Sequence, residues 1–375
     1  MKLVILKRKF HPERDPDCYA ERLLDELIDF GENLIVVAER FSGDDESPTC
    51  RWVPVPHRHA CCHNASFDRS ARKVLETLRP EEPYQAVLAL NCTQEAVDLL
   101  HVPFPLAVNA CTEKNFNCLR HWFDRRFEKK CLNGDSAAKI VVDSYFQKQQ
   151  IARYYQYPSE RIVVIPPGIL HEAYYPASID EKNQSRKNLH FHRPFIMIFG
   201  APHWKLNGLD CAIRAFAQLP PDIREQWLFV VMGEGERGAF VNLASKLGVA
   251  DDMMWAGAAD EWRDWLITAD LLIYPARCGA DDQHARQAMS CGVPVLVSRD
   301  CGIAELVPDE NTGYVVDSAE DIEQMSEKIR LFTSLPETHR QRMGENCVAQ
   351  VAGFSWRNYA EKLLLELPAQ TNVIG

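Results

Sequence analysis

The sequence of 375 residues lacks any uninterrupted apolar run that approaches the roughly 18 residues of a membrane-spanning helix. Near its amino end, the apolar run covers only residues 3–6, whereas the core of a secretory signal peptide needs at least about seven apolar residues. We therefore expect no membrane span and no cleaved leader, and we expect a cytoplasmic protein whose first apolar run is a buried strand.

An excess of positive charge is also absent. The sequence has 53 Asp and Glu against 42 Lys and Arg, which gives a formal net charge of −11. Proteins that bind nucleic acid are more often basic, so this class is disfavoured. Hydrophobic residues make up 46% of the sequence, which is enough to form sizeable cores and argues against a disordered chain. At about 150 residues per domain, the length predicts two domains.

Two further patterns are missing. The sequence has neither a complete P-loop nor a complete G-x-G-x-x-G motif. Its His- and Cys-rich segment matches no zinc-site spacing and has no second ligand cluster, so we interpret it as a surface loop and expect no metal; the segment comprises His57, His59, Cys61, Cys62 and His63. The 13 cysteines are spread along the chain, as expected of reduced and buried small apolar residues.

Apolar runs with strand and helix periodicity alternate in two series. In the first, we expect strands at residues 3–6, 33–38, 51–55, 86–90, 106–108 and 140–142, and helices at 18–30, 71–78 and 94–100. A polar stretch at 176–193 predicts a linker, and the alternation then restarts at 195. Strands that alternate with helices imply parallel sheets. The sequence thus predicts an α/β protein with two Rossmann-like, doubly wound domains, 1–175 and 176–353, and a ligand site in the cleft between them.

Glycines follow successive strands of the second series. Gly200, Gly233 and Gly257 come at expected strand ends, and Glu234 follows the second of them. Glycine there permits a sharp turn and a close approach of the backbone to a ligand. Lys205 precedes an expected helix, where its ammonium and the free amides of the helix would bind a diphosphate. Each glycine taken alone is better explained as a tight turn, whereas the set of glycines at successive strand ends favours a ligand site.

A later segment resembles a known family. After the apolar run 271–274 comes a loop with Gly279, Asp281 and Asp282, and then Ala288-Met-Ser-Cys-Gly-Val-Pro-Val. Together with the segments 208–216, 230–235, 269–275, 302–307 and 311–316, this resembles the donor domain of the family 4 glycosyltransferases. The segment 165–168 resembles the crossover of that family. The length and residues 108–114 look most like the lipopolysaccharide core glucosyltransferases.

The resemblance implies a GT-B fold and sugar transfer with retention, from a nucleotide sugar such as a UDP-sugar. It also implies that a last helix, in 354–375, packs back on the first domain. The donor would be held by Gly200, Lys205, Gly233, Glu234, Gly257, Gly279 and Gln287. Asp281 and Asp282 would reach the transferred sugar. The acceptor would meet the first domain at His11, Asn91, Asn109, Thr112 and Glu113, of which Asn109 and Glu113 are the catalytic candidates. Each of these five residues is also explained as an ordinary loop or cap residue.

The sequence departs from the family pattern at the donor site. Gly279 and Gln287 stand where the family has two glutamates, and Asn207 stands where it has a basic residue. The glycine loop of the family's first domain is replaced by residues 10–17. Two interpretations stay open, which are an active enzyme with altered donor contacts and a pseudo-glycosyltransferase that serves as a partner or scaffold subunit in surface-polysaccharide biosynthesis.

The segment 120–130 combines aromatic and basic residues at helical spacing. Trp122, Phe123 and Phe127 fall near one face, with five Lys and Arg around them. Such a helix suits an anionic membrane surface, here the inner leaflet that would carry a lipid-linked acceptor. The alternative is a helix whose aromatic side chains enter the core of the first domain.

Overall fold

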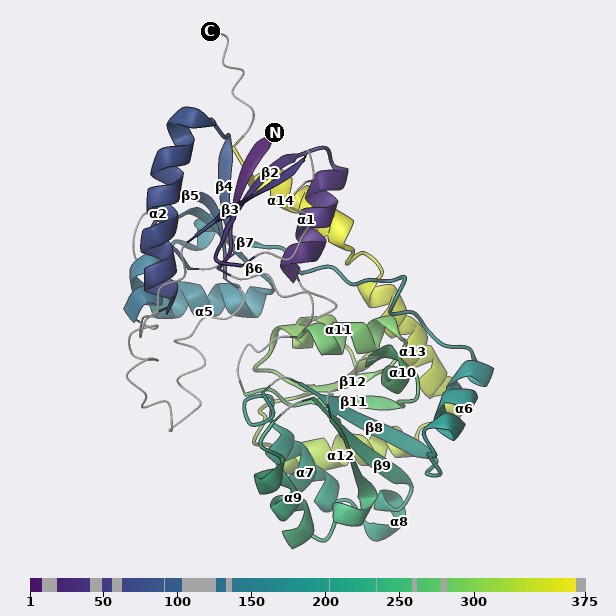
Figure 1. Cartoon of the computed structure of the whole chain (residues 1–375). Coiled ribbons are helices and arrows are strands. Elements are labelled where there is room, and N and C mark those ends of the chain that lie inside the picture. Colours follow the sequence, from purple (N-terminus) through teal and green to yellow (C-terminus); the bar gives the residue numbers. More distant parts are fainter. Residues whose placement is uncertain are drawn as a thin grey trace. The chain divides into compact units, whose positions relative to one another are not determined.

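The computed structural model describes residues 1–8, 19–40, 49–55, 63–90, 92–102, 126–132, 137–201, 203–233, 235–257, 262–277 and 282–368. The chain divides into two compact units (Figure 1). Unit 1 comprises Met1–Gly168 together with Phe354–Gly375, and unit 2 comprises Ile169–Gly353. The chain therefore enters unit 1 twice, once before and once after it forms unit 2.

Unit 1 is built on a sheet of seven strands in the order β3-β2-β1-β4-β5-β6-β7. The strands are β1 (Lys2–Leu6), β2 (Asn33–Ala38), β3 (Cys50–Pro54), β4 (Ala86–Ala89), β5 (Val97–His101), β6 (Ala137–Val142) and β7 (Ile162–Val164). Its helices include α1 (Tyr19–Asp29), α2 (His63–Glu81), α5 (Tyr145–Tyr155) and α14 (Trp356–Glu366). Each strand pairs in parallel with its neighbours, so the carboxyl ends of the strands lie at one edge.

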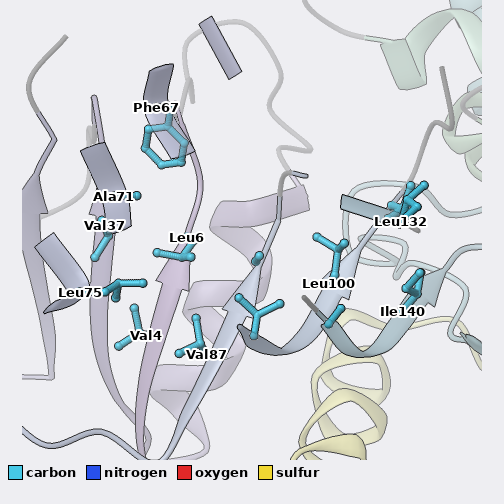
Figure 2. Packing of buried hydrophobic residues seen from close by; sticks show 14 of the residues in the cluster. Val4, Leu6, Val37, Phe67, Ala71, Leu75, Val87, Leu100, Leu132 and Ile140 are labelled. Atoms are coloured by element: carbon cyan, nitrogen blue, oxygen red, sulfur yellow. The ribbon is translucent and has the colours of Figure 1, made fainter. Parts of the chain in front are cut away.

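One hydrophobic core of unit 1 lies where α2 meets this sheet. Phe67, Ala71 and Leu75 recur every four residues and so share one face of α2. They belong to one buried cluster with Leu6 of β1 and Val37 of β2 (Figure 2). The strands are apolar along most of their length because helices cover both faces of a parallel sheet.

The helix expected at 94–100 is wrong, because this segment contains β5. β5 pairs in parallel with β4 and with β6. Asp98 stabilises the pairing, since its Oδ2 accepts a hydrogen bond from the backbone N of Val87 at 2.8 Å. A short apolar run has no periodicity that distinguishes a strand from a buried helix. The strand expected at 106–108 lies outside the described residues.

The last helix, α14, packs on α1 within unit 1. The hydroxyls of Tyr19 and Tyr359 are hydrogen bonded, and the Trp356 ring meets the edge of the Tyr19 ring with centroids 5.4 Å apart. Gly168 lies so close to the start of α14 that a Cβ there would overlap the backbone N of Trp356. Glycine at 168 is therefore a condition for this packing.

We predict that Gly168→Ala lowers the free energy of unfolding by about 1–3 kcal/mol, because the added methyl group must displace backbone atoms at the start of α14. Chemical denaturation would measure the loss. Gly353→Ala is the matched control, since a Cβ at Gly353 meets no atom within 4 Å. Equal losses for the two variants would contradict the packing argument.

Unit 2 is built on a second parallel sheet, with the strand order β10-β9-β8-β11-β12-β13. The strands are β8 (Phe195–Gly200), β9 (Trp227–Met232), β10 (Met253–Gly257), β11 (Leu271–Tyr274), β12 (Val295–Ser298) and β13 (Gly313–Val316). The helices are α6 (Ile179–Asn188), α7 (Leu209–Ala217), α8 (Pro221–Arg224), α9 (Arg237–Lys246), α10 (Trp262–Leu266), α11 (Gln283–Ser290), α12 (Ile322–Ser334) and α13 (Glu337–Val351). Two parallel sheets with helices confirm the predicted α/β fold class.

The linker expected at 176–193 is wrong in part, because α6 occupies its centre. Ser178 caps this helix, and its side chain accepts a hydrogen bond from the backbone N of Glu181. No residue of α6 is buried, so the helix has no apolar stripe that hydrophobic periodicity could reveal.

Ion pairs with Asp270 hold α6 on unit 2. Lys182 Nζ lies 3.0 Å from Asp270 Oδ1, and Arg186 Nη2 lies 2.6 Å from Asp270 Oδ2. The same Oδ2 accepts a hydrogen bond from the backbone N of Ile196, the second residue of β8. Burial raises the pKa of the Asp270 carboxyl, but Lys182, Arg186 and this amide outweigh burial and leave the pKa below its ordinary value.

The first segment of unit 1 ends at Gly168, whereas the sequence predicts a domain boundary after residue 175. The intervening residues are tied to α11 of unit 2. Ser290 Oγ donates to the backbone O of Tyr174 at 2.7 Å and lies 3.0 Å from Nδ1 of His171. These contacts bring residues 169–175 into unit 2 although the chain there is irregular.

We predict that Asp270→Asn lowers the free energy of unfolding at pH 7 by about 3 kcal/mol, because Lys182 and Arg186 lose a carboxylate partner. The folded pKa of Asp270 lies below its unfolded value of about 3.9. Its contribution is therefore present above that pH and is lost as the pH falls through the folded pKa.

Denaturation measured across pH would test this prediction. Asp317→Asn is the control, because Asp317 also pairs with an arginine, Arg299, but is 66% exposed. We expect this control to lower the free energy of unfolding by less. We also expect the difference in free energy of unfolding between Asp270→Asn and the unmodified protein to disappear at acid pH. A difference that is constant with pH would contradict the electrostatic explanation.

Candidate functional site

Three glycine turns meet at the carboxyl edge of the sheet of unit 2. Gly200 ends β8, Gly257 ends β10, and Gly233 follows β9 between them. Gly233 N donates to the backbone O of Gly257 at 2.8 Å. Gly233 and Gly257 have φ of +103° and +76°, a backbone conformation that glycine adopts without strain. The three glycines predicted from the sequence therefore lie along one edge, where ligands of such sheets bind.

Tryptophan side chains fill much of the space around these glycines. The Trp262 ring lies against Gly200, so that a Cβ there would overlap it. Trp204 Nε1 donates to the backbone O of Met232 at 3.1 Å, and the Trp204 ring lies 5.7 Å from that of Trp255. Gly200 thus accommodates an indole, and its contact with a ligand stays a prediction. The aromatic packing fixes the loop that carries Lys205.

Lys205 lies in the loop before α7, where its side chain is 63% exposed. Its Nζ lies 2.5 Å from Asp210 Oδ2, in the first turn of α7. Asp210 is also held by Arg277, whose Nη1 lies 2.9 Å from Oδ1 and whose Nη2 lies 3.0 Å from Oδ2. Arg277 Nε in turn lies 2.7 Å from Glu320 Oε1. Lys205 is therefore the accessible end of a network whose centre is Arg277.

The charge of this network is fixed at neutral pH. Burial raises the pKa of the Asp210 carboxyl, but its contacts with Arg277 and Lys205 outweigh burial and lower that pKa below its ordinary value. Asp210 consequently stays ionised and attracts Lys205. An anionic ligand would have to compete with Asp210 for the ammonium of Lys205.

The start of α7 is packed against the segment that follows β11. Gly208 precedes α7 with φ +84°, and a Cβ there would overlap the backbone O of Pro275. Asn207 is 1% exposed, and its Nδ2 donates to the hydroxyl of Tyr274 at 2.6 Å. Among the residues that the structure describes, Asn207 Oδ1 has no hydrogen-bond partner. Asn207 is thus fixed in the interior at the end of β11.

α11 begins after the loop that follows β11. Asp282 precedes its first turn and is 4% exposed, and Gln287 is 2% exposed in the second turn. The helix Gln283–Ser290 contains no acidic residue. Two of the expected donor-site residues, Asp282 and Gln287, are therefore brought together on one short helix and its cap.

The remaining predicted site residues cannot be placed. Outside the described residues lie Glu234, Gly279 and Asp281 of the donor site, His11, Asn91, Asn109, Thr112 and Glu113 of the acceptor site, residues 10–17, and the side chains of the His- and Cys-rich segment 57–63. Within the described residues no three His, Cys, Asp or Glu side chains form a group that could hold a metal ion.

The described part of the segment 120–130 enters unit 1. Residues 126–132 are helical, and Phe127 is 8% exposed. The next residue, Glu128, is buried and accepts a hydrogen bond from the hydroxyl of Tyr155 in α5. Phe127 therefore belongs to the interior, as the second interpretation of the segment expects. Trp122 and Phe123 lie outside the described residues, and no helix within the described residues is both long and apolar enough to cross a bilayer.

Sequence reasoning missed the two arginines of this region, Arg277 and Arg286. Arg277 comes three residues after the end of β11, and a cation just beyond an apolar strand is a signal that could have found it. Arg286 is 4% exposed within α11. Its burial depends on the tertiary packing of α11, and the sequence carries no comparable signal for it.

Family models match both halves of the chain. Residues 180–349 match the model described as glycosyl transferases group 1, and residues 19–172 match the model described as Glycosyltransferase Family 4. Lipopolysaccharide glucosyltransferase WaaG of Escherichia coli K12 is 28% identical over 206 residues, 54% of this chain and 55% of WaaG. D-inositol 3-phosphate glycosyltransferase of Corynebacterium diphtheriae is 26% identical over 239 residues, 61% and 55% of the two chains. The chain spans about half the length of these curated relatives.

Solved structures resemble the whole chain. A crystal structure of WaaG, titled a glycosyltransferase involved in lipopolysaccharide biosynthesis, has a TM-score of 0.80 at 23% identity and covers 98% of this chain and 100% of that one. HepE of Anabaena in complex with UDP and glucose has a TM-score of 0.75 at 15% identity, with 98% and 99% covered. These likenesses confirm the GT-B fold that the sequence predicted.

Proposed function

Because the chain belongs to the glycosyltransferase families that these two models describe, we propose that it moves a sugar from a nucleotide-sugar donor to a lipopolysaccharide-core or other surface-glycan acceptor, with retention of configuration. The observation that carries the proposal is the exposed ammonium of Lys205 at the start of α7, beside the glycine turns of β8 and β9. A cation beside the start of a helix, at the carboxyl edge of a sheet, is suited to a leaving diphosphate.

The geometry gives Lys205 a way to exchange partners. When a diphosphate takes the ammonium from Asp210, that carboxylate keeps both of its contacts with Arg277. Asp210 is therefore never left as an unpaired buried charge, and the cost of releasing Lys205 stays small. In this scheme Lys205 and the positive end of the α7 dipole neutralise the leaving group, and no metal ion is required.

The other proposed donor contacts lie along the same carboxyl edge of the sheet of unit 2 or at α11. Gln287 would hydrogen-bond the ribose, and the backbone near Gly233 and Gly257 would receive the base. Asp282, with Asp281 before it, would reach the transferred sugar. A UDP-sugar is the donor we propose, in keeping with the UDP-glucose complex of the structurally similar HepE.

The acceptor is proposed to meet unit 1 through His11, Asn91, Asn109, Thr112 and Glu113. Asn109 and Glu113 would touch the reacting hydroxyl. A lipid-linked acceptor would bring the protein to the inner leaflet, where the segment 120–130 would contact lipid through Trp122 and Phe123. The similarity to WaaG, a lipopolysaccharide glucosyltransferase, supports this class of acceptor.

We predict that Lys205→Met weakens the binding of UDP-glucose by about 10- to 100-fold, because a charge-assisted contact with the diphosphate is lost. Isothermal titration calorimetry with a panel of nucleotide sugars would measure this. Lys246→Met, which changes an exposed lysine of α9, is the control and should leave the affinity unchanged. If no nucleotide sugar binds the unmodified protein at millimolar concentration, the proposal of a donor site is wrong.

A second candidate is a catalytically degenerate pseudo-glycosyltransferase that acts as a partner or scaffold subunit. The observation in its favour is the replacement of two family glutamates by Gly279 and Gln287, while Ala288-Met-Ser-Cys-Gly-Val-Pro-Val is kept.

The double variant Gly279→Glu and Gln287→Glu separates the two candidates. A degenerate donor site should gain nucleotide affinity when the carboxylates return, whereas an active enzyme with different donor contacts should keep or lose its activity. Calorimetry and a sugar-transfer assay would report both. Micromolar binding and transfer by the unmodified protein would exclude the degenerate candidate.

A further inference from the structure

The carboxyl end of β8 lies where the strand order of unit 2 reverses. β9 and β10 lie on one side of β8, and β11, β12 and β13 lie on its other side. Ligands of open parallel sheets bind in the crevice outside the carboxyl ends of the strands, at the point of reversal. Gly200, the last residue of β8, is therefore where we expect a ligand to approach the backbone.

The indole of Trp262 occupies this position in the structure. The three atoms that a Cβ built on Gly200 would meet first are Cη2, Cζ3 and Cζ2 of Trp262, so its six-membered ring lies directly on the glycine. Trp262 is the first residue of α10, in the crossover from β10 to β11. The ring of His284, in α11, lies 4.9 Å from the Trp262 ring at an angle of 82°. The indole therefore contacts both the end of β8 and α11.

The polar atom of this indole has an unfavourable environment. Nε1 of Trp262 can only donate a hydrogen bond, and it is buried without an acceptor in the part of the chain that the structure describes. A buried donor without an acceptor is energetically costly. The residue as a whole is only half-buried. Rotation of the ring into solvent would therefore expose less apolar surface than for a core tryptophan, and it would hydrate Nε1.

Two other tryptophans of unit 2 show what a settled interior position looks like. Trp204 is 5% exposed, and its Nε1 donates to the backbone O of Met232 at 3.1 Å. Trp227 is 0% exposed, and its Nε1 donates to Oγ1 of Thr333 at 3.0 Å. Trp262 differs from both, since it is less buried and yet its donor is not satisfied. Its contact with Gly200 is therefore suited to being broken.

We propose that Trp262 gates the donor site, in that its indole covers Gly200 in the arrangement seen here and leaves when the nucleotide sugar binds. This inference rests on the proposed donor site. In the covered arrangement the ring blocks the backbone of Gly200, and in the open one a donor can approach it closely. Because the donor would bind only the open arrangement, the apparent affinity is reduced in proportion to the fraction of molecules that are open.

Calorimetry with UDP on the full chain tests the proposal. Trp262→Ala should bind UDP about 10-fold more tightly than the unmodified protein, because no indole then has to leave Gly200. Trp265→Ala is the matched control, since it removes a second indole from the same helix, one that packs against Phe191. It should leave the affinity unchanged. Weaker binding by Trp262→Ala would show that the indole holds the donor, and it would overturn the proposal.

Tryptophan fluorescence gives a second readout that does not require the alanine variant to fold. If UDP displaces the indole of Trp262 from the interior into water, the emission of the unmodified protein shifts to longer wavelength. Trp262→Phe, which keeps an aromatic ring at this position, should lose the shift, and Trp265→Phe should keep it. A shift that persists in Trp262→Phe, or that is absent from the unmodified protein at saturating UDP, would contradict gating.

The outcomes separate this inference from the function it rests on. If UDP binds the unmodified protein and Trp262→Ala with equal affinity, gating is wrong while the donor site stands. If UDP binds neither protein at millimolar concentration, the donor site fails and gating fails with it. Thermal melting of each variant shows whether it is folded, and the fluorescence of Trp262→Phe decides the question if Trp262→Ala does not fold.

Discussion

The contact of Arg277 with Asp210 holds together the carboxyl edge of unit 2. Arg277 follows β11, Asp210 opens α7, and the two side chains are joined by a pair of hydrogen bonds. The guanidinium also donates to the backbone O of Lys205, which fixes the loop before α7. Together with the packing of Trp204, this contact positions Lys205 relative to the glycine turns. It also leaves Asp210 a partner when Lys205 is released. The ion pair between Arg277 and Asp210 thus helps to position the ammonium of Lys205, which is the cation proposed to bind the donor.

The strands of unit 2 could be predicted closely because their signals are local. The apolar runs of β8, β9 and β11 are each bounded by a glycine or proline, and the structure has strands at these places. α6 could not be predicted, because a polar helix depends on Asp270, which lies more than 80 residues away in the sequence. β5 was misassigned for a related reason, since its partners β4 and β6 decide its conformation.

In the candidate site, too, residues with local sequence signals could be predicted, and contacts between distant segments could not. Gly233, Gly257 and Lys205 were found from the sequence because strand ends and helix starts carry short-range signals. Their setting was not found, because it consists of contacts between distant segments. Trp262 against Gly200 is one such contact, and Asn207 against Tyr274 is another. Several residues of the proposed donor site could therefore be predicted from the sequence, but the contacts that hold them in place could not.

The return of the chain to unit 1 has a consequence for biosynthesis. Trp356, Tyr359, Ala360 and Leu363 of α14 are buried in unit 1, and they are made after every residue of unit 2. Unit 2 is continuous, so the ribosome can release all of it while the face of α1 that receives α14 is still uncovered. Nascent chains fold from completed segments, and the order of completion here is unit 2 before unit 1. The half that is translated first is therefore the last to complete its core.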